Sequence, residues 1–428
     1  MIWIYRLLFP LILLTTAPYY LWRMRRRGGY GRGFWHRFGL PPRLAARRPG
    51  VRRVWLQAVS VGEILAVEPI VRALAADGVE VVLTTTTSTG YRVAADRYLP
   101  VVSAIAYFPV DWMPFSSRAW ARISPDLAIV TEGERWPEHM HQARGHGVPV
   151  LCINARISDR SFRRLRRFPA VAEFVLRPMT RLLAGSPQDA RRFRDLGYPA
   201  ERVAVTGNIK LDVQIPRLDE AGRAALRAEL GLPAGRLVVL GSSTWPGEEA
   251  ALVNALVAAR AKGVECSLLL VPRHAERRAE IERMLMETGL SYHMRSLGPA
   301  PGMVDVAVGD TTGELRTMAQ IADVVFVGKS LAPHTEGQTP VEAAALCKPI
   351  LFGPGMGNFR AIARDLHDRG AARSVVDAAD LCDQVLALLR DPAQRGLISA
   401  AAASWRNDNG GAVDRTLEAI REELAKAA

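Results

Sequence analysis

The sequence alternates between short apolar runs, rich in β-branched residues, and longer stretches rich in Ala, Leu and Arg. The runs span Val54–Val59, Val79–Leu83, Leu127–Thr131, Val150–Asn154 and Leu182–Gly185 in the first half, and Leu237–Gly241, Cys266–Val271, Val304–Val308, Val324–Gly328 and Ile350–Gly353 in the second. Such runs are typical of strands buried on both faces, and the stretches between them are typical of crossover helices. The alternation predicts an α/β fold with two Rossmann-like domains.

The two series of runs are separated by a segment in which Pro216 and acidic residues interrupt the pattern. After the second series, Val413, Leu417, Ile420 and Leu424 recur at helical spacing and predict an amphipathic helix. The expected order after the basic segment is a first Rossmann-like domain over residues 54–211, a linker over 212–219, a second such domain over 220–410 and a terminal helix over 411–428.

Residues 1–22 are apolar apart from Arg6 and a few small polar residues. As a helix they would extend about 33 Å, near the thickness of the hydrocarbon core of a bilayer. Residues 23–53 form a basic juxtamembrane segment, which by the positive-inside rule would keep the rest of the chain in the cytoplasm. Because Pro10, Pro18 and Arg6 weaken a straight span, a spanning anchor, an interfacial helix and a secretory signal all remain open.

The net charge of +13 would suit a nucleic-acid-binding protein, but the position of the charge does not. Twelve arginines and no acidic residue lie between Met1 and Arg53, whereas the rest of the chain carries 44 basic and 43 acidic residues. A second concentration, six arginines and one acid, runs from Arg156 to Arg167. The expected partner of the N-terminal charge is an anionic membrane and not nucleic acid.

Several common kinds of site are disfavoured. The four cysteines are Cys152, Cys266, Cys347 and Cys382; they lie far apart without a CxxC pair, which indicates reduced thiols in the cytoplasm and no structural zinc. No G-x-G-x-x-G follows the first strand and no P-loop occurs, which disfavours nicotinamide oxidoreductases and P-loop enzymes. We expect neither a metal nor a cofactor.

Polar residues follow three predicted strands of the first domain, at the edge where α/β sheets bind ligands. The turn Ser60-Val61-Gly62-Glu63 would place the Glu63 carboxylate at a helix start, as a general base or merely as a favourable partner of the helix dipole. Glu132 and Glu134 flank a glycine after another strand, as site residues or as a solvated loop.

The arginine-rich stretch after the next strand has two interpretations. Arg156, Arg160 and Arg163 would contact a phosphorylated or carboxylated acceptor, or they would form a solvated helix face.

The second domain carries a different set of residues after its strands. Gly241–Thr244 predicts a phosphate-facing turn, and Arg273, in Pro272–His274, is placed to meet an anionic ligand. Gly313–Leu315 opens another helix. Thr339–Glu342 has the form of a capping box, which would orient Glu342 without any ligand.

In combination these motifs resemble those of the bacterial 3-deoxy-D-manno-octulosonic acid (Kdo) transferases of lipopolysaccharide assembly. The matching segments follow the family's order, from the N-terminal anchor to about Phe359. They are Ser60–Glu63, Glu132–Pro137, Asn154–Ser158, Gly207–Asp212, Gly241–Thr244, Pro272–His274, Gly313–Leu315 and Thr339–Glu342.

The resemblance implies a GT-B architecture, in which two Rossmann-like domains face each other across a cleft. It also implies metal-independent transfer of Kdo from CMP-Kdo to a lipid A precursor, with inversion at the anomeric carbon. The enzyme would lie at the inner membrane, with a single N-terminal anchor and its catalytic domains facing the cytoplasm.

The resemblance also assigns roles to residues. Glu63 would be the base that deprotonates the acceptor hydroxyl, Arg273 would meet the donor phosphate, and Glu342 would hold the ribose. Acceptor-binding residues would be Ser60, Glu132, Glu134, Arg156, Arg160 and Arg163, and the further donor-binding residues would be Ser242, Ser243, Thr244, His274, Gly313, Glu314, Leu315, Lys329 and Thr339.

Some positions depart from the family pattern. Thr339 stands where asparagine is common, although it would preserve the predicted cap, and Lys329 replaces a common glycine. Arg135 and Glu138 stand where an aliphatic residue and asparagine are usual. Two alternatives therefore remain: a GT-B enzyme that uses a nucleotide diphosphate sugar, and a membrane-tethered glycolipid-binding protein without turnover.

Overall fold

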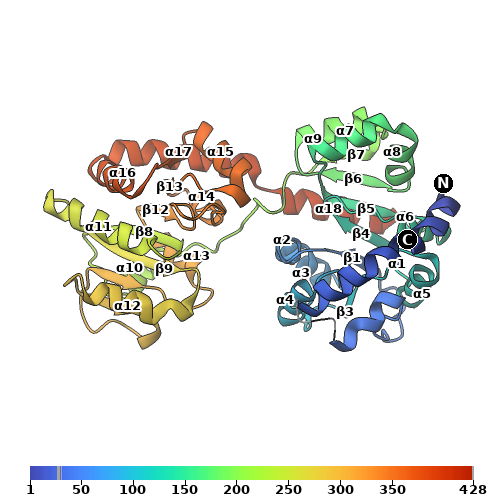
Figure 1. Ribbon diagram of the computed structural model, residues 1–428, viewed down its shortest axis with the longest axis horizontal. Coiled ribbons are helices and arrows are strands. Elements are labelled where there is room, and N and C mark those ends of the chain that lie inside the picture. Colours follow the sequence, from blue (N-terminus) through green and yellow to red (C-terminus); the bar gives the residue numbers. More distant parts are fainter. Residues whose placement is uncertain (27–28, 30, 427–428) are drawn as a thin grey trace. The chain divides into compact units, whose positions relative to one another are not determined.

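The chain folds into two compact units, as seen in a computed structural model that describes residues 1–26, 29 and 31–426 (Figure 1). Unit 1 comprises Met1–Asp212 and Gly410–Ala428, and unit 2 comprises Val213–Asn409. Arg27, Gly28 and Tyr30 of the predicted basic segment lie outside the described residues.

Unit 1 contains a parallel sheet in the order β3-β2-β1-β4-β5-β6-β7. Its strands are β1 (Arg53–Gln57), β2 (Glu80–Thr85), β3 (Ala104–Tyr107), β4 (Leu127–Thr131), β5 (Val150–Ala155), β6 (Arg181–Ala184) and β7 (Val203–Val205). The helices are α1 (Ile2–Arg26), η1 (Gly31–Phe38), α2 (Val61–Ala66), α3 (Glu68–Ala76), α4 (Ser88–Tyr98), α5 (Met113–Ile123), α6 (Pro137–Gly145), α7 (Asp159–Arg167), α8 (Pro169–Leu176), α9 (Pro187–Asp195), η2 (Ala200–Arg202) and α18 (Ala412–Lys426).

Unit 2 contains a second parallel sheet in the order β10-β11-β9-β8-β12-β13-β14. Its strands are β8 (Leu237–Thr244), β9 (Cys266–Pro272), β10 (Tyr292–Met294), β11 (Val306–Val308), β12 (Val324–Val327), β13 (Ile350–Phe352) and β14 (Ala372–Ser374). The helices are α10 (Glu220–Glu229), α11 (Glu248–Ala261), η3 (Ala275–Arg277), α12 (Arg278–Met286), η4 (Arg295–Leu297), α13 (Leu315–Met318), η5 (Ala319–Ile321), α14 (Val341–Ala345), η6 (Gly357–Phe359), α15 (Arg360–Asp368), α16 (Ala378–Arg390) and α17 (Pro392–Asn409).

The predicted α/β class is confirmed, and each sheet is wider than the sequence pattern suggested. Each of the ten apolar runs overlaps a strand, and four further strands are present: β3, β7, β10 and β14. These four are the edges of the two sheets and are only three or four residues long. The central strands β11 and β13 are equally short but buried throughout, whereas β7, β10 and β14 include partly buried or exposed residues and so give a weaker apolar signal.

The last helix of the chain belongs to the core of unit 1. Leu417 and Ile420 of α18 are buried in one apolar cluster with Ile64 and Leu74 from α2 and α3. The Asp212 carboxylate accepts a hydrogen bond from the Val413 N–H at 2.8 Å. The last residue of the first segment of unit 1 thus holds the start of α18. Unit 1 is therefore completed only by residues that follow unit 2 in the sequence.

Two local predictions in unit 2 are wrong. Gly241–Thr244 is not a turn, because β8 continues to Thr244 with an irregularity at Ser243, whose φ is 54°. The capping box is absent as well: α14 begins at Val341, after Pro340, and the Thr339 hydroxyl accepts the Val341 N–H at 3.2 Å without a reciprocal bond from Glu342. The proline occupies the position at which the side-chain cap was expected.

We predict that Ile420→Ala destabilises unit 1 and leaves unit 2 unchanged. The side chain is fully buried, so its truncation should cost about 2–5 kcal/mol of unfolding free energy. Hydrogen–deuterium exchange should speed up at the amides of β1 and β4 but not at those of β8 and β12. Glu418→Ala, on the exposed side of α18, is the matched control. Equal acceleration in both units would contradict this assignment of α18.

Candidate functional site

Glu63 is held at the C-terminal edge of the unit 1 sheet by three donors. Its Oε1 accepts the Ser60 hydroxyl at 2.8 Å, and its Oε2 accepts the Val59 N–H at 2.9 Å and the Thr131 hydroxyl. Ser60 is also the N-cap of α2, since its Oγ accepts the Glu63 N–H. The carboxylate is thus fixed between β1 and β4, as the sequence predicted for the helix start.

The hydrogen bonds of Glu63 leave one acceptor position open. A carboxylate offers about two lone pairs on each oxygen. Oε2 uses both of its lone pairs and Oε1 uses one, and no further donor among the described residues reaches Oε1. Glu63 is 8% exposed, so this remaining lone pair belongs to a desolvated but not sealed carboxylate. Such a group can accept a proton from a hydroxyl that binds beside it.

Glu134 is a second carboxyl group close to Glu63. Burial is the main cause that raises the pKa of Glu134 to about 7, with a further contribution from the charge of Glu63. The Trp136 indole N–H donates to Glu134 Oε2 at 2.5 Å and partly opposes that rise. At neutral pH the acid and carboxylate forms of Glu134 are therefore both populated.

Glu132 makes an ion pair with Lys210, a residue outside the predicted acceptor-binding set. Lys210 Nζ lies 2.5 Å from Glu132 Oε1, and the Asn154 side-chain amide donates to the same oxygen at 3.3 Å. Glu132 and Asn154 both have positive φ angles, 54° and 50°, so the loop backbone is strained where these side chains meet. Lys210 stands in the Gly-Asn-x-Lys-x-Asp segment, which was the available signal for this contact.

The arginines of the acceptor-side prediction lie at the surface. Arg156 is exposed after β5, and Arg160 and Arg163 are exposed on α7, a helix with no buried residue. The structure therefore brings Ser60, Glu63, Glu132 and Glu134 together on the edge of the sheet, and places the arginines on an exposed face beside it.

Unit 2 has its own buried carboxylate, Glu248, in the first turn of α11. Glu248 is 1% exposed and accepts four backbone N–H groups, those of Trp245, Lys329, Ser330 and Leu331, at 2.7–3.1 Å. All four lone pairs are used, so this carboxylate fixes the loops that follow β8 and β12 and has no capacity for a ligand. The loops after β8 and β12 also approach each other closely at Gly328, where a Cβ would lie 2.5 Å from the Ser243 carbonyl oxygen.

Three donor-side atoms are buried without a hydrogen-bond partner among the described residues. They are Thr244 Oγ1, Trp245 Nε1 and Glu342 Oε2. Buried polar atoms are rarely left unpaired, so each is a candidate ligand contact. Glu342 keeps one interaction, between its Oε1 and Arg316 at 3.5 Å.

Aromatic and cationic side chains surround Trp245. Lys329 Nζ lies 4.2 Å from the centre of the Trp245 ring, and the rings of His274 and His334 meet it edge-on at 5.3 and 5.7 Å. Arg273 is exposed at the end of β9, and its N–H donates to the Thr244 carbonyl at 3.2 Å. The predicted donor residues after β8, β9 and β12 are thus neighbours.

Glu314 turns away from the other donor candidates. Its carboxylate accepts the Thr311 hydroxyl and contacts Arg295 at 3.4 Å, and the Thr311 hydrogen bond is the main cause that lowers its pKa. Gly313, with a φ of 92°, makes the turn into α13. This segment can offer a ligand its backbone, while the Glu314 side chain is committed to the protein.

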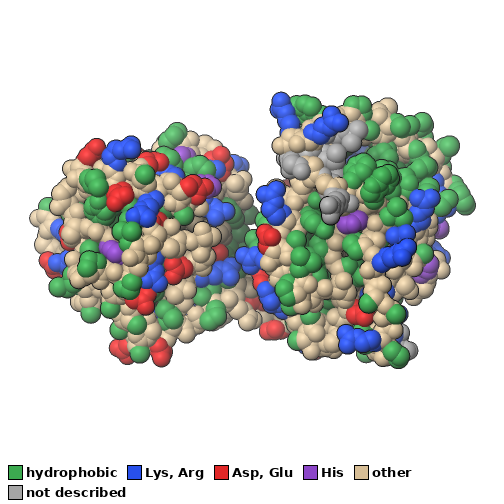
Figure 2. Space-filling model, turned by 90° about the horizontal axis from the view of Figure 1, so that it is seen from below, with side chains coloured by type: hydrophobic (Ala, Val, Ile, Leu, Met, Phe, Trp, Pro, Cys, Tyr) green, Lys and Arg blue, Asp and Glu red, His purple; other side chains and the backbone are tan. Residues whose placement is uncertain are grey.

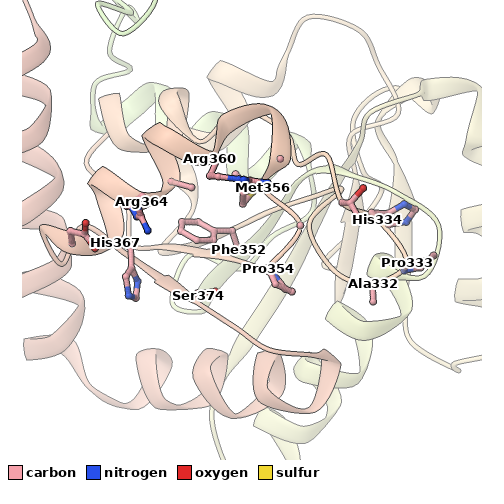
Figure 3. Close-up of a pocket in the computed structure, with 16 residues that line it drawn as sticks. Ala332, Pro333, His334, Phe352, Pro354, Met356, Arg360, Arg364, His367 and Ser374 are labelled. Atoms are coloured by element: carbon pink, nitrogen blue, oxygen red, sulfur yellow. The ribbon is translucent and has the colours of Figure 1, made fainter. Parts of the chain in front are cut away.

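A cavity of about 730 Å³ in unit 2 lies beside residues 332–335 of the loop that follows β12 (Figure 3). His334 and Pro333 border it at one end, and Arg364 and His367 of α15 at the other (Figure 3). None of the predicted donor-binding residues lines this cavity. Within the described part of the chain, no three His, Cys, Asp or Glu side chains gather as a metal site would require.

Comparison with known proteins adds the family. Residues 32–213 match the family described as 3-deoxy-D-manno-octulosonic-acid transferase (kdotransferase). A 3-deoxy-D-manno-octulosonic acid transferase from Bordetella pertussis is 37% identical over 97% of this chain and 99% of its own length. The Haemophilus influenzae protein of the same name is 31% identical over 97% of this chain and 94% of its own length.

Solved structures agree on the fold. HepE from Anabaena, in complex with UDP, is 16% identical, covers 88% of this chain and 100% of its own, and gives a TM-score of 0.53. UDP-GlcNAc 2-epimerase from Neisseria meningitidis is 14% identical, covers 87% and 100% of the two chains, and gives 0.54. The predicted GT-B fold is confirmed.

We predict that the Trp136 indole N–H reports the titration of Glu134. Its ¹⁵N–¹H NMR signal should shift with a midpoint near pH 7, because the indole donates to that carboxyl. The signal should lose this titration in Glu134→Gln and keep it in Glu132→Gln. Since the folded-state pKa is raised from the ordinary value of 4.5, the stability of unit 1 should fall as the pH rises from about 4.5 to about 7 and then level off, and this fall should be smaller in Glu134→Gln. A midpoint near 4 would contradict the effect of burial.

Proposed function

The chain belongs to the Kdo transferase family, and on this premise we propose that it transfers Kdo from CMP-Kdo to a lipid A precursor with inversion at the anomeric carbon. It is a glycosyltransferase of lipopolysaccharide biosynthesis.

The open lone pair of Glu63 is the observation that carries the proposal. An acceptor hydroxyl that donates to Oε1 would lose its proton to Glu63 as its oxygen attacks the anomeric carbon of Kdo. The bond from that carbon to the phosphate oxygen breaks, and CMP leaves with the electron pair. The three donors of Glu63 fix its direction, so no reorganisation is needed at the moment of reaction.

Unit 2 supplies contacts that suit a nucleoside monophosphate. Arg273 would offset the charge that develops on the leaving phosphate, and the unpaired Glu342 Oε2 would accept a ribose hydroxyl. A phosphate monoester that leaves as CMP needs one such cation and the backbone donors around it. The proposed reaction therefore uses no metal and no cofactor.

The acceptor is proposed to reach Glu63 from a membrane. Arg156, Arg160 and Arg163 present cations to solvent on the same unit as Glu63, as a phosphorylated lipid would require. By length and composition α1 is the one described helix able to cross a membrane. We place the enzyme on the inner membrane, with α1 as its anchor and both units in the cytoplasm.

We predict that Glu63→Gln lowers transfer by about 10²–10⁴-fold, the usual range for loss of a general base. The assay uses the purified protein in detergent with CMP-Kdo and a tetraacylated lipid A precursor, and detects free CMP and the heavier lipid by mass spectrometry. Affinity for CMP, a property of unit 2, should stay unchanged. Full activity of this variant would remove Glu63 from the base role, whereas absence of turnover in the wild-type protein would favour a binding protein.

We predict that CMP binds more tightly than UDP, and that Glu342→Gln weakens CMP binding roughly tenfold, the usual loss for a charge-assisted hydrogen bond. Isothermal titration of the wild type and the variant would measure both. Glu287→Gln, at the exposed C-terminal end of α12, is the control. Tighter binding of UDP would favour the alternative of a nucleotide diphosphate sugar donor.

A further inference from the structure

The first turns of α1 are locked to unit 1 by a buried ion pair. Arg6 Nε and Nη2 donate to the two carboxylate oxygens of Glu138 at 2.7 and 2.8 Å. Glu138, on α6, is fully buried, and the Arg6 side chain is only 13% exposed. Gln142 adds a third donor to Glu138 at 2.7 Å. A fork-to-fork pair in this environment fixes both the position and the direction of Arg6.

A second contact lies one residue away on α1. The Tyr5 hydroxyl donates to Asp111 Oδ2 at 2.7 Å, and the same carboxylate accepts the N–H groups of Glu138 and His139 at the start of α6. The Trp112 indole N–H donates to the Arg6 carbonyl at 3.2 Å. We call Tyr5, Arg6, Asp111 and Glu138 the latch.

The two long faces of α1 differ in exposure. The face that carries Tyr5, Arg6, Phe9 and Leu13 is partly buried. Large apolar side chains on the opposite face are 48–73% exposed: Trp3, Ile4, Leu7, Leu8, Leu11, Ile12 and Leu14. Figure 2 shows hydrophobic side chains gathered on one flank of unit 1, with Lys and Arg side chains close by. An exposed apolar strip next to cations is the surface that an anionic bilayer fits.

The latch conflicts with a transmembrane helix. If α1 spanned a bilayer with its following arginines in the cytoplasm, Arg6 would lie about 26 Å away, near the opposite surface. Glu138 lies in the same unit as Glu63 and could not reach it there. The segment after α1 returns to the same region as well, because the Arg37 carbonyl accepts the Val110 N–H and Phe38 packs on Phe115.

We propose that α1 is a one-leaflet helix, held flat on unit 1 by the latch, whose outer apolar face enters the cytoplasmic leaflet of an anionic bilayer. Neither end of the helix crosses the membrane. Detachment would leave Glu138 buried without its cation and would carry Arg6 into hydrocarbon. This inference rests on the proposed membrane location of the enzyme but requires no turnover for its test.

The test places a protease-cleavable epitope before Met1 of the full chain, in inner-membrane preparations from a Gram-negative host. Protease should remove the epitope in inverted vesicles and leave it intact in spheroplasts, because the N-terminus lies on the cytoplasmic side. Removal only from the periplasmic side would overturn the proposal. The readout is independent of Kdo transfer, so failure of the proposed reaction would not affect it.

Arg6→Leu tests the latch. The substitution breaks the ion pair and also removes the charge that opposes insertion, so the periplasmic share of the epitope should rise roughly tenfold. Arg48→Leu, at an exposed arginine of the basic segment over residues 23–53, is the matched control. Unchanged topology in Arg6→Leu would overturn the role of the latch.

A vesicle flotation assay tests whether lipid covers the exposed apolar face of α1. The purified chain should float with vesicles of phosphatidylethanolamine and phosphatidylglycerol, and Leu7→Asp should reduce the bound fraction roughly tenfold. A chain that instead forms soluble dimers through this face, and ignores vesicles, would overturn the membrane assignment.

Discussion

The organisation of both units depends on one carboxylate in the first turn of the helix that follows their first strand. In unit 1 it is Glu63 of α2, and in unit 2 it is Glu248 of α11. Backbone N–H groups at the ends of parallel strands point to the same edge of the sheet and need acceptors there. Each carboxylate supplies such an acceptor and thereby fixes the loops around it.

The difference between the two carboxylates lies in their remaining capacity. Glu248 spends all of its lone pairs on four backbone N–H groups, so it is purely structural. Glu63 has one donor fewer and takes two of its three from hydroxyl groups, which leaves Oε1 able to receive a substrate proton. A carboxylate in the same position thus serves as a scaffold in unit 2, and in unit 1 it keeps an open acceptor position, where we propose the catalytic base.

The sequence predicted the buried strands and the turn at Glu63, because apolar runs and an S-x-x-E start are local signals. It did not predict contacts that depend on distant segments. Lys210 meets Glu132 across two strands, and Glu248 meets a loop some 80 residues away. Three of the four edge strands, β7, β10 and β14, include partly buried or exposed residues and so lack a continuous apolar run. The capping box failed because Pro340 moves the start of α14 beyond Thr339.

The return of the chain to unit 1 also determines the order in which the protein can be built on a ribosome. Unit 2 is continuous over Val213–Asn409 and can complete its core while it emerges. Unit 1 is made first but lacks the apolar side of α18 until residues 412–426 have been synthesised. Until then, the side chains of Ile64 and Leu74 remain partly exposed to solvent. If α1 binds the bilayer as proposed, the nascent chain would contact the membrane while unit 1 is still incomplete.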